Sequence, residues 1–187
     1  MVDLQEAKVL EKGENQLGLS SGYFVPAENQ GPLAIDGGMF YKVGLGKKVE
    51  LTTRASWFMA VRFDLKYQLY ANPSNTLFMA TGFNLGTTAF TFEEQLGNIR
   101  FQTPLYLTYM PAPWLSFYGN VKYHYQIPRR FGGNGLHLLT YNTGLRLGKK
   151  AGLMMEINHV PFYNEHLGIP VNFRELSQVH AGLFLNF

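Results

Sequence analysis

Apolar residues occupy every second position through most of this 187-residue chain, and no other feature limits its possible folds as strongly. A period of two places the apolar side chains of an extended strand on one face and the polar side chains on the other. Residues 61–69, which read V-R-F-D-L-K-Y-Q-L, show the clearest alternation. Because the pattern recurs almost to the last residue, the sequence predicts an all-β fold.

Ten segments carry the pattern, and most have about the nine to eleven residues with which a tilted strand crosses a bilayer. They are residues 16–24, 37–45, 49–57, 61–69, 77–85, 101–109, 115–125, 139–147, 153–158 and 179–187. We therefore expect a closed antiparallel up-and-down transmembrane β-barrel of about ten strands at 15–187, preceded by a short N-terminal periplasmic tail at 1–14. Little turn chemistry separates the third and fourth segments around Phe58–Ala60, so eight strands is the alternative.

The connections between these segments alternate in length. Short turns are expected at Gly46–Lys48, Asn72–Asn75, Pro111–Pro113 and Gly148–Lys150. Longer connections are expected at Pro26–Ile35, Gly86–Asn98, Pro128–Gly135 and Pro161–Ser177. Short turns at one rim and long loops at the other are typical of membrane barrels.

The composition agrees with this fold and excludes several functions. Hydrophobic residues make up 46% of the chain and charged residues 16%, and the net charge of +3 is spread along it, which argues against nucleic-acid binding. The absence of cysteine rules out disulfides and thiolate metal sites. The start, M-V-D-L-Q-E, lacks the pattern of a secretory signal peptide, which fits either a cytosolic protein or a mature exported chain.

Alternation does not show which face points inward, since a soluble lipocalin-like barrel has the same period with its faces exchanged. Charges of both signs on the polar face favour a lumen in which they pair with one another. The residues assigned to this lumen network are Lys42, Glu50, Arg54, Arg62, Asp64, Lys66, Arg100, Lys122, Arg146 and Glu156, and Asp36 is counted with them. Aromatic residues gather at the strand ends, as in the interfacial girdles of membrane barrels: Tyr23, Phe24, Trp57, Phe58, Tyr70, Tyr109, Trp114, Tyr123 and Tyr125.

The last strand ends on Phe187, with Val179, Ala181, Leu183 and Leu185 at alternate positions before it. This ending resembles the terminal strand of bacterial outer-membrane proteins. The resemblance implies a mature chain in the outer membrane after removal of a signal peptide, with Phe187 as a signal for the barrel-assembly machinery. Outer-membrane lipids and lipopolysaccharide would then be its partners, and we expect a monomer that does not bind nucleic acid.

Reactive side chains are most frequent near the ninth segment and the loop after it, where His159 and Glu156 are candidates for ester hydrolysis. The region resembles the outer-membrane lipid A deacylases, whose catalytic histidine is followed two residues later by a serine. Here that position is Pro161, which carries no nucleophile, so we expect no catalytic residue. The spacing of His159, His166 and His180 with Glu165 matches no familiar metal site, and we expect neither a metal nor a cofactor.

Two more expectations concern anions. Arg129 and Arg130 lie in a long loop and could contact the phosphates of lipopolysaccharide. The lumen charges predict either a structural network that fills the interior or a narrow pore that favours anions. The expected role is thus structural, surface-interacting or solute-conducting, with a lipid A-modifying hydrolase or a soluble ligand-binding barrel as alternatives.

Overall fold

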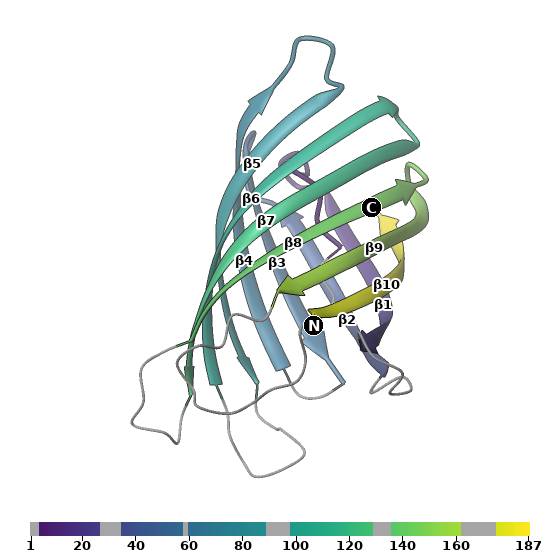
Figure 1. The fold of residues 1–187 in the computed structure, drawn as a ribbon. Coiled ribbons are helices and arrows are strands. Elements are labelled where there is room, and N and C mark those ends of the chain that lie inside the picture. The colour runs from purple at the N-terminus through teal and green to yellow at the C-terminus, as the bar shows by residue number, and fades with distance from the viewer. Residues whose placement is uncertain (1–3, 27–34, 58–59, 89–97, 129–135, 162–174) are drawn as a thin grey trace.

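The computed structural model describes residues 4–26, 35–57, 60–88, 98–128, 136–161 and 175–187. The described residues form ten antiparallel strands that close into a barrel (Figure 1). The strands are β1 (Asn15–Pro26), β2 (Ile35–Gly44), β3 (Val49–Ser56), β4 (Ala60–Ala71), β5 (Leu77–Thr88), β6 (Asn98–Ala112), β7 (Leu115–Pro128), β8 (Leu136–Leu147), β9 (Ala151–Pro161) and β10 (Glu175–Asn186). No helix among the described residues is long and apolar enough to span a membrane.

Each strand pairs with its neighbours in the sequence, and β1 pairs with β10 to close the barrel. The predicted up-and-down fold is therefore confirmed, with ten strands and not eight. β3 and β4, which the sequence separates by little turn chemistry, are two strands that form an ordinary antiparallel ladder. In it Leu51 lies opposite Leu65 and Thr53 opposite Phe63. Both strands alternate strictly over their paired residues, 49–55 and 61–67, so pairing them places the large apolar side chains of this stretch on one face.

The two ends of the barrel differ in the length of their connections. One end, here called the short-turn end, carries the connections at 45–48, 72–76, 113–114 and 148–150. The other, here called the long-loop end, carries those at 27–34, 57–59, 89–97, 129–135 and 162–174. Because β1 begins and β10 ends at the short-turn end, the chain enters and leaves the barrel there.

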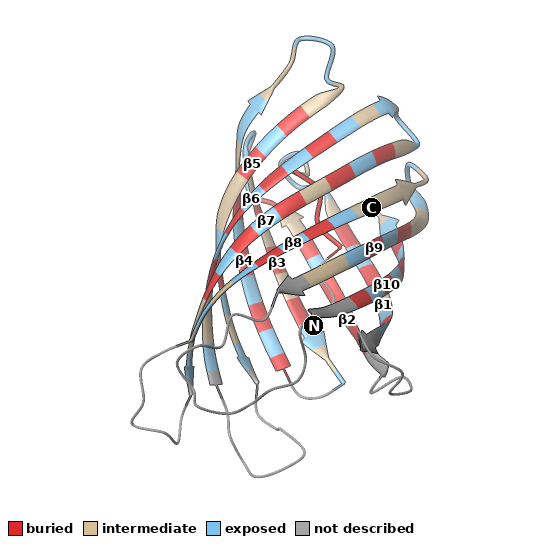
Figure 2. Ribbon diagram, in the orientation of Figure 1, coloured by how far each residue is buried: buried red, intermediate tan, exposed pale blue. Residues whose placement is uncertain are grey.

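The apolar face points outward. Leu65 on β4 and Leu183 on β10 are 48% and 63% exposed. Asp64 and Lys66, the residues before and after Leu65, are only 1% and 2% exposed. Figure 2 shows the resulting alternation of buried and exposed positions along the strands. A soluble lipocalin-like barrel has the reverse orientation, so that alternative is wrong.

Aromatic side chains lie exposed at both ends of this apolar exterior. Tyr23 and Trp57 lie toward the long-loop end and are 52% and 71% exposed. Tyr70, Tyr109 and Trp114 lie toward the short-turn end and are about half exposed. Two aromatic bands that flank an apolar belt are the arrangement expected where rings meet membrane–water interfaces.

Candidate functional site

The first described residues form no strand and instead run through the lumen near its short-turn end (Figure 1, purple). We call residues 4–12 the N-terminal segment. The side chains of Leu4, Gln5 and Ala7 in it are fully buried. The stretch expected as a tail outside the barrel thus has its described part inside, because inward side chains alone do not fill a barrel wider than about eight strands.

Two apolar clusters hold this segment against the inner wall. Leu4 packs with side chains from four strands, which are Phe40, Tyr118, Met154 and Phe184. Ala7 packs in a second cluster with Phe78, Ala80 and Tyr106. Burying a leucine side chain contributes about 1.5–3 kcal/mol, so the Leu4 cluster is a substantial anchor.

Glu6 adds a charged anchor. Arg146 Nη1 lies 2.8 Å from Glu6 Oε2, and the Ser116 hydroxyl donates a hydrogen bond to the other carboxylate oxygen. On the opposite side of the segment, Lys66 Nζ donates to the backbone carbonyl of Glu6 at 2.8 Å. The barrel wall therefore binds both the side chain and the backbone of this residue.

Barrel side chains also accept hydrogen bonds from the segment's backbone. Ala7 N donates to Thr108 Oγ1 at 2.7 Å, Val9 N to Gln68 Oε1 at 3.2 Å, and Leu10 N to Glu50 Oε2 at 3.0 Å. A backbone outside regular structure needs such partners when it is buried. The lumen therefore satisfies the backbone of the segment in the way that a neighbouring strand would.

Asp64 is the centre of the charge network that the N-terminal segment contacts. Its Oδ2 accepts hydrogen bonds from Arg54 Nε at 3.0 Å and Gln5 Nε2 at 2.5 Å. Its Oδ1 lies 2.8 Å from Arg62 Nε, in an ion pair. Arg54 and Arg62 are cross-strand neighbours, so this carboxylate offsets the repulsion between two buried guanidinium groups.

A second ion pair, between Lys66 Nζ and Glu50 Oε1 at 2.8 Å, continues the network toward the short-turn end. Toward the long-loop end, amide, imidazole and hydroxyl side chains join the charged groups of the network. Its hydrogen bonds there include Asn84 to Gln102, Gln102 to His124, His124 to Thr140, Asn142 to Glu156 and Arg100 to Gln126. The interior is therefore packed with interacting polar side chains on both sides of Asp64.

All ten charged residues assigned to the lumen from the sequence lie at inward-facing positions. Arg100 and Arg146 are half-buried, and the others are buried: Lys42, Glu50, Arg54, Arg62, Asp64, Lys66, Lys122 and Glu156. The side chain of Asp36 lies outside the described residues. Alternation placed these charges because strand geometry leaves each residue one of two faces.

His159 and Glu156, the weak catalytic candidates, lie on opposite faces of β9. Glu156 is 1% exposed in the lumen, where it accepts a hydrogen bond from Asn142 at 2.9 Å. His159 lies on the outer face, with its ring centroid 4.9 Å from that of Tyr141. An odd separation along a strand always divides two side chains in this way, so the pair cannot act as a catalytic dyad.

The same geometry separates the candidate metal ligands. His180 is 1% exposed and faces the lumen, where it contacts Gln178 at 3.2 Å, whereas His159 faces outward. These two histidines therefore cannot bind one ion, and His166 and Glu165 lie outside the described residues. Within the described part of the chain, no three histidine, aspartate or glutamate side chains are grouped as metal ligands.

The remaining predicted sites concern the surface and the last residue. Arg129 and Arg130 lie outside the described residues, so their contact with lipid phosphate stays a prediction. Phe187 follows β10, is 64% exposed, and exchanges two backbone hydrogen bonds with Asn15 at 2.9 and 3.0 Å. Its role in assembly stays a prediction as well.

The N-terminal segment is the functional element that sequence reasoning missed. It has no periodicity of its own, and its polar composition resembles that of a solvated tail. One indirect signal exists on the inner wall at Gly182, where a Cβ atom would collide with Leu4. An inward glycine in a strand often marks a close approach of another chain segment.

Replacing Leu4 with aspartate is expected to release this segment. The new carboxylate would lie within a closed apolar cluster, which costs several kcal/mol without a partner. We expect trypsin to cleave after Lys8 in Leu4→Asp and to spare this bond in the unaltered protein, as read by mass spectrometry. Glu11→Gln, at an exposed position of the same segment, is the control and should leave Lys8 protected. Equal protection in Leu4→Asp would show that the apolar cluster does not hold the segment.

No protein-family model and no curated protein matches this sequence. An outer membrane channel from Pseudomonas putida F1 is 9% identical, with a TM-score of 0.50 and 100% of both chains covered. The N-terminal β-barrel domain of Pseudomonas aeruginosa OprF is 11% identical, with a TM-score of 0.41, over 94% of this chain and 100% of that one. Likenesses at such low identity concern the fold alone. The chain has the fold of a small bacterial outer-membrane β-barrel.

Proposed function

We propose that this protein is an integral barrel of a bacterial outer membrane whose lumen is closed by its own N-terminal segment. In the state described here it acts as a structural envelope protein and not as an open channel. The observation that carries the proposal is the combination of an apolar exterior with a filled, charged interior. An exterior of this kind is costly in water and favourable in lipid.

Closure is supported by the burial of the lumen charges. Lys66, Asp64, Lys122 and Glu156 lie on different parts of the wall and are each 1% or 2% exposed. A water-filled channel would leave such side chains hydrated, as in the polar interior of a porin. Their low exposure indicates that neighbouring side chains and the N-terminal segment fill the space between them.

A narrow anion pore is the second candidate, and the charge balance of the wall favours it over a cation pore. Seven basic side chains face the lumen: Lys42, Arg54, Arg62, Lys66, Arg100, Lys122 and Arg146. Three carboxylates among the described side chains of the wall oppose them: Glu50, Asp64 and Glu156. Conduction would require the N-terminal segment to leave.

Outer-membrane lipids and lipopolysaccharide are the partners that this proposal implies, with Arg129 and Arg130 as candidates for phosphate contact. The barrel-assembly machinery would recognise the terminal strand that ends at Phe187. We propose a monomer because the barrel closes on itself and leaves no strand edge for a second copy to extend.

Placement in a membrane is tested by an arginine introduced on the exterior. Leu65 lies near the middle of β4 and is 48% exposed, so Leu65→Arg would place a charge near the bilayer centre. We expect a loss of about 2–4 kcal/mol in the free energy of unfolding from lipid vesicles. Leu45→Arg, at a similarly exposed position of the short-turn rim, is the matched control and should lose about 0–1 kcal/mol.

The measurement is urea unfolding in vesicles followed by tryptophan fluorescence. Heat-modifiable migration on a denaturing gel verifies that each variant folds. Equal losses at the two positions would contradict membrane placement, because depth would then have no effect on the energy.

A further inference from the structure

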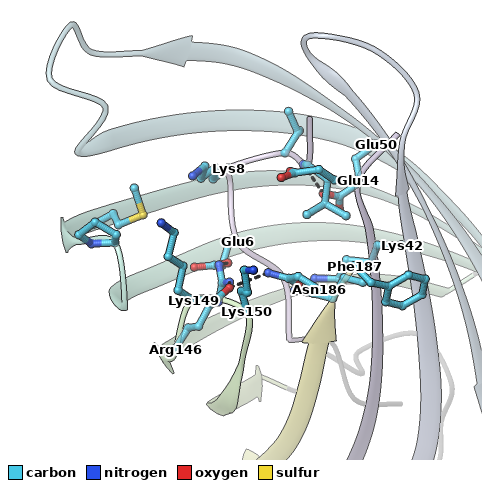
Figure 3. Close-up of a pocket in the computed structure, with 15 residues that line it drawn as sticks. Glu6, Lys8, Glu14, Lys42, Glu50, Arg146, Lys149, Lys150, Asn186 and Phe187 are labelled. Carbon is cyan, nitrogen blue, oxygen red and sulfur yellow. Dashed lines mark hydrogen bonds and ion pairs between the residues drawn. The ribbon is translucent and has the colours of Figure 1, made fainter. Parts of the chain in front are cut away.

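A cavity of about 400 Å³ opens at the short-turn end of the lumen, beside the N-terminal segment (Figure 3). Its lining includes five cationic side chains, which are Lys8, Lys42, Arg146, Lys149 and Lys150. Three carboxylates also line it, which are Glu6, Glu14 and Glu50. Its volume lies within the range of about 300–1,000 Å³ that is usual for small-molecule sites.

Two of the three carboxylates are already neutralised by specific partners. Glu6 is paired with Arg146 at 2.8 Å, and Glu50 is paired with Lys66, which is not a lining residue, at 2.8 Å. Four lysines and Glu14 then remain as the charges that determine the field in the cavity. The cavity therefore has an excess of positive charge.

Lys42 is the most informative of these lysines. It is 3% exposed, its Nζ lies 3.3 Å from the carbonyl oxygen of Leu4, and it lies 5.1 Å from the centroid of the Phe40 ring. Among the described residues, no carboxylate lies within 4.0 Å of its Nζ. Glu50, the carboxylate that interacts with Lys42 most strongly, is already paired with Lys66 at 2.8 Å. A buried ammonium group that shares its carboxylate with another lysine is costly, and a bound anion would reduce that cost.

Lys149 and Lys150 are held at the cavity mouth by the backbone of their turn. The Lys149 carbonyl accepts hydrogen bonds from Arg146 Nη2 at 3.2 Å and Asn186 Nδ2 at 2.8 Å. The Lys150 carbonyl accepts one from Asn186 N at 2.6 Å. Gly148, with a φ of +109°, allows the tight turn that brings the two lysines beside Arg146.

Glu6 shows how the wall holds a carboxylate. Its two oxygens are bound by Arg146 and by the Ser116 hydroxyl. Figure 3 shows Glu6 beside Arg146 and near Lys149 and Lys150. Because Glu6 occupies Arg146 and Ser116, the acid groups of a bound molecule would meet the charges of three lysines instead, Lys42, Lys149 and Lys150. The local chemistry is thus suited to a molecule with more than one carboxylate.

We propose that the short-turn mouth of the lumen is a binding site for small organic anions with two or three carboxylates. The N-terminal segment contributes Lys8 and the barrel wall contributes the remaining cations. The site needs the N-terminal segment inside the lumen, so it belongs to the closed state and would be lost in a conducting one. It faces the compartment into which the short turns project.

The test is titration of citrate into the protein in uncharged detergent micelles, followed by calorimetry. We expect one citrate per barrel and no heat of binding for glucose, a neutral solute of similar size. The double variant K149Q/K150Q should bind citrate about tenfold more weakly, because it loses two ion pairs at an exposed rim.

The chain offers a matched control, because the Leu-Gly-Lys-Lys sequence of the cavity turn, at 147–150, also occurs at 45–48. Lys47 and Lys48 are equally exposed but do not line the cavity, so K47Q/K48Q changes the net charge by the same amount. We expect its citrate affinity to stay within twofold of the unaltered protein. Failure of the unaltered protein to bind citrate would overturn the proposal, and so would equal losses in the two double variants.

Discussion

Deletion of residues 4–12 is expected to convert a silent barrel into a conducting one in planar lipid bilayers. The segment fills the short-turn end of the lumen through the Leu4 and Ala7 clusters and the contacts of Glu6. Its removal leaves a ten-stranded wall without the chain that occupied its interior. A barrel wider than about eight strands has room beyond its inward side chains, so we expect discrete conductance steps.

The current should favour anions, because seven basic side chains and three described carboxylates line the wall once Glu6 is gone. The reversal potential in a gradient of potassium chloride measures this preference. Glu11→Gln keeps the segment and should stay silent. A deleted protein that is folded but silent would show that wall side chains alone close the lumen.

Replacement of Asp64 with asparagine is expected to destabilise the barrel by about 3–5 kcal/mol, the usual cost of removing one partner from a buried ion pair. Asp64 is 1% exposed and lies within 3.0 Å of both Arg54 and Arg62. Asparagine has nearly the same shape, so the loss reports charge and not packing. Without the carboxylate, two guanidinium groups on neighbouring strands repel each other in the interior.

Urea unfolding in lipid vesicles, followed by the fluorescence of Trp57 and Trp114, measures this loss. The control is Glu11→Gln, which removes an exposed carboxylate and should change the free energy of unfolding by no more than about 0.5 kcal/mol. A similar small change in Asp64→Asn would contradict the view that this residue balances the arginines.

The barrel wall could be predicted from the sequence because strand geometry offers each residue two faces. Once Leu65 and Phe63 are assigned outward, Asp64 and Lys66 must point inward, and the structure places them there. Only one question about the strand count stayed open in the sequence, which was whether the third and fourth segments are separate strands. Strand ends extend past the alternating core in several cases, as in β6, which continues to Ala112.

The plugged lumen could not be predicted in the same way. Residues 4–12 have no repeating pattern, and their contacts with the barrel wall join them to distant parts of the chain, as Gln5 does with Asp64 and Ala7 with Thr108. The mouth cavity depends on these contacts and on which of two identical turns lies beside Arg146. Such pairings follow from how the segment folds back into the barrel, which local sequence does not encode.

The central claim is that the exterior meets lipid while the interior is closed to water. The chain has no cysteine, so single cysteines can be introduced at Leu65 and Lys66 and labelled with a nitroxide after unfolding and refolding in vesicles. We predict that the label at 65 is relaxed strongly by oxygen, which concentrates in acyl chains, and weakly by a water-soluble nickel complex. The label at 66 should be shielded from both reagents. A label at 65 that responds to the nickel complex and not to oxygen would contradict the account.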